Sequence, residues 1–305
     1  MTYNSKTPVL IIIFNRPVFV KNLIDILRQV KPSKIYVVAD GPRNFIMEDK
    51  DNCIKAREQI NKIDWVCDIK RKYSDNNLGC GLNPAEGISW ALKDSEEVII
   101  LEDDCMPNIE FFRFCDNLLE KYKSNDQVMM VSGNNHTFNK YDFSHSYDFS
   151  HHTQTYGWAT WRRAWSKYDI NMNSWPEFRS FEWLESFTGS KKAAKFWLKI
   201  FDMCYNNELS SAWDYQWTYC CWVNNGINII PKVNLVSNIG FSSQATHEKD
   251  PDHLISQVPT STIEFPLIHP EEIIKKTLLD KTIQKIIYTP PIYTRIMNKL
   301  STIIK

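Results

Sequence analysis

The chain has 305 residues, 43% of them hydrophobic and 24% charged, which is typical of a folded globular protein and excludes wholesale disorder. Lys plus Arg and Asp plus Glu both number 36, so the net charge is zero and nucleic acid is not an expected partner. The longest apolar run, Val9 to Phe14, is far too short to cross a bilayer. The eight cysteines form no CxxC pair and no basic-then-apolar leader opens the sequence, so we expect reduced thiols in a cytoplasmic protein.

The first 135 residues alternate short apolar segments with longer segments of helical spacing. The expected buried strands are residues 8–14, 34–39, 97–101 and 128–131, with 68–73 as a weaker strand. The expected helices are residues 17–30, 83–93 and 108–123. This alternation predicts an α/β fold with a mostly parallel sheet that helices cover on both faces.

Residues 136–268 have a different texture, so we expect a second subdomain there. Residues 137–155 are aromatic, polar and His-rich, and are expected to form a long loop or hairpin. The histidines His145, His151 and His152 lack the ligand spacing of a zinc site. Trp and Tyr crowd the residues that follow. The expected elements are helices over 190–206 and 212–224, then an extended segment over 227–239.

Residues 269–305 form a third segment, a basic amphipathic tail. Asp280 is the single acid between residues 275 and 305, against seven Lys or Arg. Apolar side chains recur at near-helical spacing from Ile273 to Ile287, and again beyond Pro290-Pro291. Residues 273–305 therefore either lie peripherally on an anionic membrane surface or pack as a helix on the body of the protein.

Three consecutive acids, Glu102, Asp103 and Asp104, follow the strand expected over residues 97–101. Carboxylates gathered at the carboxyl end of a parallel strand repel one another unless a cation lies between them. Oxygen ligands suit Mn²⁺ or Mg²⁺, which in turn neutralise phosphate groups. A solvated acidic turn is the alternative interpretation.

Two other strand ends carry candidate binding residues. Asp40 is followed by Gly41-Pro42, so it either caps a turn or accepts hydrogen bonds from a nucleotide base or ribose. The first strand ends in Phe14-Asn15-Arg16-Pro17, where Arg16 faces a phosphate or base, or lies on the surface before a helix.

Asp214 lies between aromatic residues in Ser211-Ala-Trp213-Asp214-Tyr215-Gln-Trp217. A carboxylate at a helix start is favoured by the backbone dipole. In an apolar pocket, burial would raise its pKa and suit it to act as a base. His247, in a Gly/Ser-rich loop, is a candidate ligand of the metal or of a diphosphate, or a surface residue.

In their order along residues 8–247, these segments resemble GT-A glycosyltransferases, in particular the N-acetylglucosaminyltransferase I group and its bacterial relatives. The similar blocks are Pro8-Val-Leu-Ile-Ile-Ile-Phe-Asn-Arg16, Val37-Val-Ala-Asp40-Gly41, Trp90-Ala-Leu with Val98–Asp104 and Phe111-Phe112, Tyr156-Gly157-Trp158, and Trp213-Asp214. There are departures: Gly87 stands where the family has a His before its Trp-Ala-Leu helix, and Tyr215 stands where it has a second acid.

The resemblance implies a GT-A-type sheet and a role for each matching residue. Asp104 would coordinate Mn²⁺, while Glu102 and Asp103 would contact the donor sugar or ribose. Asp40 would bind uracil or ribose, and Asp214 would be the general base. The elbow of Phe14 and Arg16, together with Trp158 and Trp213, would complete the donor and sugar site.

The expected function is metal-dependent transfer of N-acetylglucosamine or another hexose from a UDP-sugar to a saccharide hydroxyl, with inversion. Residues 1–135 would bind the nucleotide sugar and residues 136–268 the saccharide or lipid-linked saccharide acceptor, in surface polysaccharide synthesis at the inner face of the cell membrane. The alternatives are a non-catalytic carbohydrate-binding protein and a sugar-nucleotide nucleotidyltransferase. The second would normally carry a Gly-rich phosphate loop near the first strand, which Asn15-Arg16-Pro17 does not supply.

Overall fold

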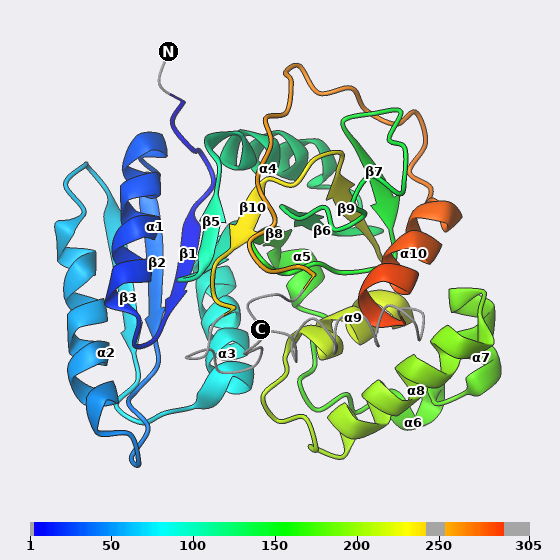
Figure 1. The fold of residues 1–305 in the computed structure, drawn as a ribbon, viewed down its shortest axis with the longest axis horizontal. Coiled ribbons are helices and arrows are strands. Elements are labelled where there is room, and N and C mark those ends of the chain that lie inside the picture. The colour runs from blue at the N-terminus through cyan, green and yellow to red at the C-terminus, as the bar shows by residue number, and fades with distance from the viewer. Residues whose placement is uncertain (1–2, 242–253, 290–305) are drawn as a thin grey trace, which may run out of the picture.

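The computed structural model describes residues 3–241 and 254–289. Its main sheet has eight strands in the order β3-β2-β1-β4-β8-β6-β9-β7 (Figure 1). These are β1 (Val9–Ile13), β2 (Lys34–Ala39), β3 (Asp68–Tyr73), β4 (Glu97–Glu102), β6 (Val128–Ser132), β7 (Tyr147–Ser150), β8 (Trp158–Trp161) and β9 (Ile227–Pro231). A separate antiparallel pair joins β5 (Cys105–Pro107) to β10 (Val236–Asn238).

Helices surround this sheet on both faces. They are α1 (Pro17–Val30), α2 (Met47–Gln59), α3 (Gly79–Asp94), α4 (Ile109–Tyr122), α5 (Arg162–Trp165), α6 (Trp175–Phe178), α7 (Phe181–Thr188), α8 (Lys191–Tyr205), α9 (Asp214–Val223) and α10 (Thr277–Ile283), with short turns η1 (Ile60–Lys62) and η2 (Gln284–Tyr288). The expected α/β class, a mixed and mostly parallel sheet flanked by helices, is confirmed. β3, β2, β1 and β4 run parallel, and β8 runs antiparallel between β4 and β6.

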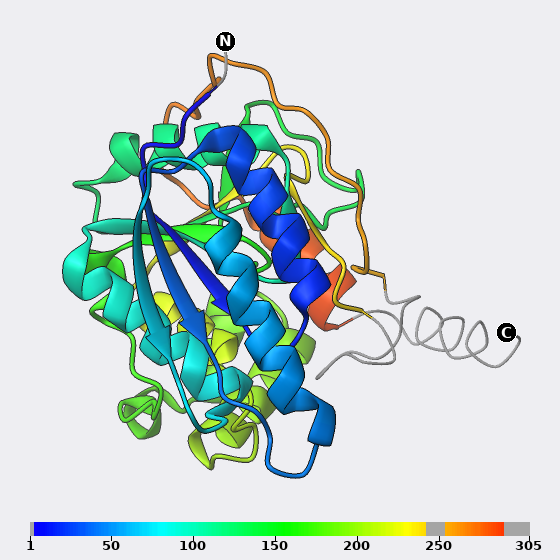
Figure 2. The ribbon, with the colours of Figure 1, turned by 90° about the vertical axis from the view of Figure 1, so that its left-hand side faces the viewer.

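β1 shows why the central strands are apolar throughout. Val9, Ile11 and Ile13 pack in one cluster with the buried faces of α1 and α4, and Leu10 and Ile12 pack in another with α3. Since both faces of the sheet are covered, every position of the strand is buried. Figure 2 shows α1 and α2 side by side against one face of the β1–β3 half of the sheet.

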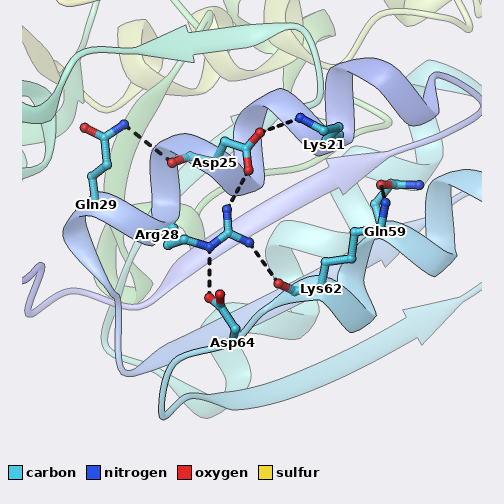
Figure 3. Close-up of polar contacts among 7 residues, drawn as sticks. All are labelled: Lys21, Asp25, Arg28, Gln29, Gln59, Lys62 and Asp64. Carbon is cyan, nitrogen blue, oxygen red and sulfur yellow. Dashed lines mark hydrogen bonds and ion pairs between the residues drawn. The ribbon is translucent and has the colours of Figure 1, made fainter.

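α1 begins at Pro17, which suits the first turn of a helix, and buries one stripe of side chains against the sheet. Its exposed face carries a polar network (Figure 3). Arg28 bonds to Asp25 on its own helix at 2.5 Å, to Asp64 at 2.9 Å and to the carbonyl of Lys62 at 3.0 Å. Such exposed pairs each contribute little to stability, so this network orients α1 against η1 more than it holds the fold.

The second half continues the same sheet and adds a helical layer. α6, α7 and α8 lie together at one end of the molecule (Figure 1). Their core is aromatic, and the tryptophans Trp175, Trp197, Trp217 and Trp222 are almost completely buried.

Several predicted boundaries were wrong. Residues 137–155 are not all loop, because β7 lies within them and pairs with β9 rather than forming a local hairpin. α2 has no apolar stripe along most of its length, so hydrophobic periodicity did not predict a helix there. α3 begins at Gly79, four residues earlier than predicted, and accommodates Pro84.

The amphipathic tail is only partly within the described residues. α10 covers 277–283, where Leu279 and Ile283 are fully buried and cluster with Phe143 and Ile230. The packed-helix interpretation therefore holds for α10, and residues 290–305 lie outside the described part. Within the described residues, the structure contains no helix with the length and apolar character needed to span a bilayer.

Candidate functional site

A cavity of about 530 Å³ opens where β1, β2 and β4 reach their carboxyl ends. Residues at the ends of these strands, the first turns of α3 and α9, and the end of β10 line it. The predicted site residues in its wall are Phe14, Arg16, Asp40, Glu102, Asp103, Asp104, Trp213 and Asp214. Segments between residues 12 and 241 thus meet at the edge of the sheet where α/β proteins bind ligands.

Arg16 lies against the acid triplet. Its Nη1 is 3.0 Å from Asp104 Oδ2, and its other terminal nitrogen pairs with Asp103. The backbone N–H of Phe14 also donates to Asp103, at 3.3 Å. The elbow after β1 therefore supplies the positive charge that permits Asp103, 1% exposed, to be buried.

Electrostatics distinguishes the three acids. Burial, followed by the neighbouring charge of Asp104, raises the pKa of Glu102 to about 8. Burial also raises the pKa of Asp103, to about 6, although Arg16 opposes the shift. Burial lowers the pKa of Arg16 but the charges of Asp103 and Asp104 outweigh it, so the guanidinium stays charged. Glu102 is therefore the carboxylate least compensated by the protein.

The acid triplet supplies part of a donor set for a divalent cation. No group of three His, Cys, Asp or Glu side chains in the described residues forms a metal cage. Mg²⁺ and similar cations commonly use only one or two carboxylates, with water and substrate phosphates completing the shell. Glu102 and Asp104 suit that mode, since the charge of Asp104 helps to raise the pKa of Glu102 and a cation would relieve this repulsion.

β10 fixes the position of Asp104 from the other side. Asn238 pairs with Cys105 in register, and its amide donates to Asp104 Oδ1 at 3.3 Å. Gly240 follows, and a Cβ at this position would overlap the Asp104 carboxylate. Close approach of the chain to the acid explains the glycine.

Asp40 organises the adjacent loop. One of its carboxylate oxygens accepts from the N–H groups of Gly41 and Leu78, each at 2.8 Å. The other accepts from the N–H of Gly79 at 2.9 Å and the amide of Asn77 at 3.0 Å. Burial raises the pKa of Asp40, while these backbone bonds lower it. Asp40 lies in the cavity wall, but its carboxylate already accepts four hydrogen bonds from the protein. These bonds hold the start of α3 in place.

Asp214 is the first residue of α9 and lines the same cavity as the acid triplet. Its charge is among the causes that raise the pKa of Glu102. Burial, then the charges of Asp214, Asp104 and Glu102, also raise the pKa of Tyr156 far above its ordinary value. Tyr156 and Asp214 therefore share one electrostatic environment with the triplet.

Trp213, 5% exposed, lies in the cavity wall, whereas Trp158 is behind it. The two rings stack with centroids 5.6 Å apart and planes 20° apart. Trp158 thus packs against Trp213 and is not one of the described residues that line the cavity. His247 lies outside the described residues.

Sequence reasoning missed several lining residues. Asn238 ends β10 and Gly240 follows it, Asn77 precedes α3, and Asn83 lies on α3. Asn77 sits in a polar turn sequence, Asp-Asn-Asn-Leu-Gly, which signals a loop but not its partner. Asn83 and Asn238 had no sequence signal, because only the sheet order brings them to the cavity.

Comparison with known proteins adds little to this geometry. No protein-family model and no curated protein matches the sequence. A UDP-glucose pyrophosphorylase complexed with UDP-glucose is similar with 12% identity and a TM-score of 0.25, over 41% of this chain and 56% of that one. Mouse xyloside xylosyltransferase 1, in its apo form, is similar with 10% identity and a TM-score of 0.32, over 71% of this chain and 81% of that one. The chain thus spans just over half the length of the pyrophosphorylase.

Proposed function

We propose that the chain is a glycosyltransferase that takes its sugar from a UDP-sugar donor. The observation that carries the proposal is that one cavity at the carboxyl edge of the sheet is lined by Glu102, Asp103, Asp104 and Arg16 and also by Asp214. Anion-handling groups in one cavity with a carboxylate base suit a reaction in which a diphosphate leaves and a hydroxyl attacks.

The donor diphosphate would lie beside Arg16 and the triplet. Arg16, whose two terminal nitrogens pair with Asp103 and Asp104, would add its positive charge beside the phosphates, with 29% of its side chain exposed. Asp104 and Glu102 would hold Mn²⁺ or Mg²⁺, which supplies charge neutralisation to a departing diphosphate. Asp103, held by Arg16 and Phe14, would keep the other two acids in place.

Asp214 would act as the general base. It accepts the proton of an acceptor hydroxyl while that oxygen bonds to the anomeric carbon and the bond from this carbon to the diphosphate breaks. Attack from the face opposite the leaving group inverts the configuration. Trp213 in the cavity wall offers an aromatic surface for the sugar.

The subdomain roles are part of the proposal. Residues 1–135 contribute Arg16, Asp40 and the triplet, and residues 136–268 contribute Trp213 and Asp214. We propose a hexose or N-acetylhexosamine as the transferred sugar, and a saccharide or lipid-linked saccharide as the acceptor in polysaccharide synthesis. Peripheral membrane contact of residues 273–305 would fit a lipid-linked acceptor. Leu279 and Ile283 are buried in the protein, so other side chains of this segment would make the contact.

The test is hydrolysis of a panel of UDP-sugars with Mn²⁺, with Mg²⁺ and with a chelator. We expect slow hydrolysis of one or two UDP-sugars that the chelator abolishes, and transfer once an acceptor saccharide is added. UTP with sugar 1-phosphates forms the second arm. Pyrophosphate release in that arm would point to a nucleotidyltransferase. If the chain shows no hydrolysis and no donor-induced rise in melting temperature, the proposal is contradicted and the carbohydrate-binding module remains.

A further inference from the structure

A second cavity, of about 180 Å³, lies between the end of α7, the start of α10 and the residues that follow β7. Trp222 of α9 lines it, whereas Asp214 of the same helix lines the cavity of the acid triplet, the donor cavity. Eight residues of helix separate these two positions, which is a rise of about 12 Å. The described lining residues of the two cavities do not overlap, so the proposed function leaves the second one unassigned.

Positive charge predominates in the second cavity. Lys275 and Lys281 line it, and Asp280 is the one acid among its described lining residues. His151 and His152 are neutral at pH 7, because burial lowers the pKa of each to about 3. Neither lysine forms an ion pair with a residue that the structure describes. Two ammonium groups thus face one carboxylate, and an anion would bring the remaining charge into balance.

Asp280 is already engaged by the protein. Its Oδ1 accepts hydrogen bonds from the hydroxyl of Ser150 at 2.6 Å and from the backbone N–H of His151 at 2.9 Å. These bonds join α10 to the end of β7 and shape the cavity wall. Lys275 acts on Asp280 only through its charge, which lowers the pKa of that carboxyl. Asp280 therefore does not replace an anion bound directly to the lysines.

Lys275 is held in position before any ligand arrives. Its Nζ lies 3.4 Å from Nδ1 of His151 and 5.4 Å from the centroid of the Phe187 ring. An ammonium group only donates, so Nδ1 of His151 accepts. The His151 ring in turn stacks on Phe187 with centroids 4.0 Å apart. A cation fixed in this way loses little freedom when an anion binds to it.

α10 adds a hydroxyl and a second ammonium group. Thr277 and Lys281 are four residues apart, so they are neighbours on one face of the helix, and both line the cavity. Both side chains are exposed and therefore open to a ligand from solvent. Ile274 and Leu278, on the same segment, are 53% and 65% exposed. Exposed apolar side chains beside lysines are typical of segments that contact anionic lipids.

We propose that the second cavity binds a phosphate group, to which the ammonium groups of Lys275 and Lys281 and the hydroxyl of Thr277 donate. Lysine binds phosphate as a point charge, and two lysines match the charge of about −1.5 to −2 that a phosphate monoester carries at pH 7. A soluble phosphate monoester and the headgroup of phosphatidic acid share this chemistry. The proposal is independent of the proposed function, because the donor cavity plays no part in it.

The end of α7 offers a competing role for Lys281. A Cβ added at Gly189, which follows the last residue of α7, would lie 3.9 Å from Cε of Lys281. Lysines in such a position can bond to the last carbonyl groups of a helix. That role predicts a loss of stability in Lys281→Met without ligand. A phosphate site predicts a melting temperature at or above that of the wild type, since the replacement removes an uncompensated charge.

The experiment measures binding of glycerol 3-phosphate and of acetate to the full chain by calorimetry, with a chelator present so that no metal holds phosphate in the donor cavity. Lys275→Met and Lys281→Met should each lower the affinity for glycerol 3-phosphate about tenfold or more, because each removes a charged donor. The matched control is Lys285→Met, which removes an exposed lysine of the same segment outside the cavity. Its affinity should stay within about twofold of wild type.

Sedimentation with phosphatidylcholine vesicles, with and without phosphatidic acid, identifies the source of the phosphate. Tighter binding to phosphatidic acid than to glycerol 3-phosphate, lost in Lys281→Met and kept in Lys285→Met, assigns a lipid, and otherwise the ligand is the soluble ester. The proposal is overturned if neither binds, if acetate binds as tightly as glycerol 3-phosphate, or if Lys285→Met loses as much affinity as Lys281→Met. A clearly lower melting temperature of Lys281→Met without ligand assigns this lysine to the end of α7 and overturns its role in phosphate binding.

Discussion

The Nη1 atom of Arg16 lies 3.0 Å from Oδ2 of Asp104, although 88 residues separate them in the sequence. The parallel pairing of β1 with β4 causes this contact, since both strands end at the same edge of the sheet. The same guanidinium also pairs with Asp103. The elbow after the first strand is therefore the internal counter-ion of the acid triplet.

Replacing Arg16 by Met should destabilise the protein, because it keeps much of the aliphatic stem but leaves Asp103 and Asp104 without their cation. Breaking a fully buried pair costs about 3–5 kcal/mol. Since 29% of the Arg16 side chain is exposed, we expect about 1–3 kcal/mol, measured by urea unfolding without ligand.

The matched control is Arg28→Met, which removes the arginine of the exposed network in Figure 3 and should cost under about 1 kcal/mol. Mn²⁺ should recover part of the stability lost in Arg16→Met, by binding to the uncovered carboxylates of the folded state. Equal stability of Arg16→Met and wild type would mean that the triplet needs no counter-ion.

Asp214→Asn should separate binding from chemistry. The amide nearly preserves the shape of the first residue of α9, but it cannot take up a proton. We expect sugar transfer to fall about 10²–10⁴-fold, while UDP affinity stays within about twofold of wild type. The measurement is initial transfer rate beside calorimetric UDP binding. Near-wild-type turnover would remove Asp214 as the base, whatever the function of the cavity.

Two histidines far from this cavity should make stability depend on pH. Burial lowers the pKa of His151 and of His152 to about 3 each, with the charge of Lys275 adding to both shifts. Asp280 also faces this pair, its carboxylate 4.0 Å from His151. Between pH 6.5 and 3 the unfolded chain binds protons that the folded chain does not, so stability rises with pH in this window and falls on acidification.

Each ring contributes up to about 1.4 kcal/mol per pH unit in that range. His152→Phe removes one titrating ring and a buried Nδ1 that has no hydrogen-bond partner, and retains stacking against Tyr288. Its unfolding free energy should fall less steeply between pH 6.5 and 4.5. His145→Phe, which replaces a ring that is 28% exposed, serves as the comparison variant. Parallel slopes for all three proteins would mean that His152 is protonated in the folded state.

The sequence predicted the central strands well because their burial on both faces leaves a simple pattern of continuous apolar residues, as in β1 and β2. It predicted the acid triplet as a group because the three residues are adjacent. β8 was missed, since its Trp-Ala-Thr-Trp sequence is short and lies between β4 and β6, far from both in the chain.

Sequence reasoning predicted those site residues that follow a recognisable strand end or helix start. It missed those that only long-range packing brings to the cavity. Asp214 follows from its place at a helix start. The pairing of Arg16 with Asp104 and the position of Asn83 depend on the order of the strands. The sequence left two roles open for Asp40, capping a turn or binding a nucleotide. The four hydrogen bonds that Asp40 accepts from the protein favour the turn-capping role.

The contact between Gly87 on α3 and Val38 on β2 allows a test of how this helix packs on the sheet. In an ordinary helix, Gly→Ala stabilises by about 0.5–1 kcal/mol, because Ala loses less conformational freedom. Here the added methyl would lie 2.8 Å from a Val38 methyl carbon, and overpacking costs about 1–3 kcal/mol. We therefore expect Gly87→Ala to lower the free energy of unfolding of the otherwise wild-type chain, measured by thermal or urea unfolding. In a Val38→Ala background both methyl contacts are removed and the Cβ of residue 38 remains close, at 3.2 Å, so the same change should destabilise much less. A double-mutant cycle measures this coupling, and an equal effect of Gly87→Ala in both backgrounds would show that the Val38 methyl groups do not limit this position.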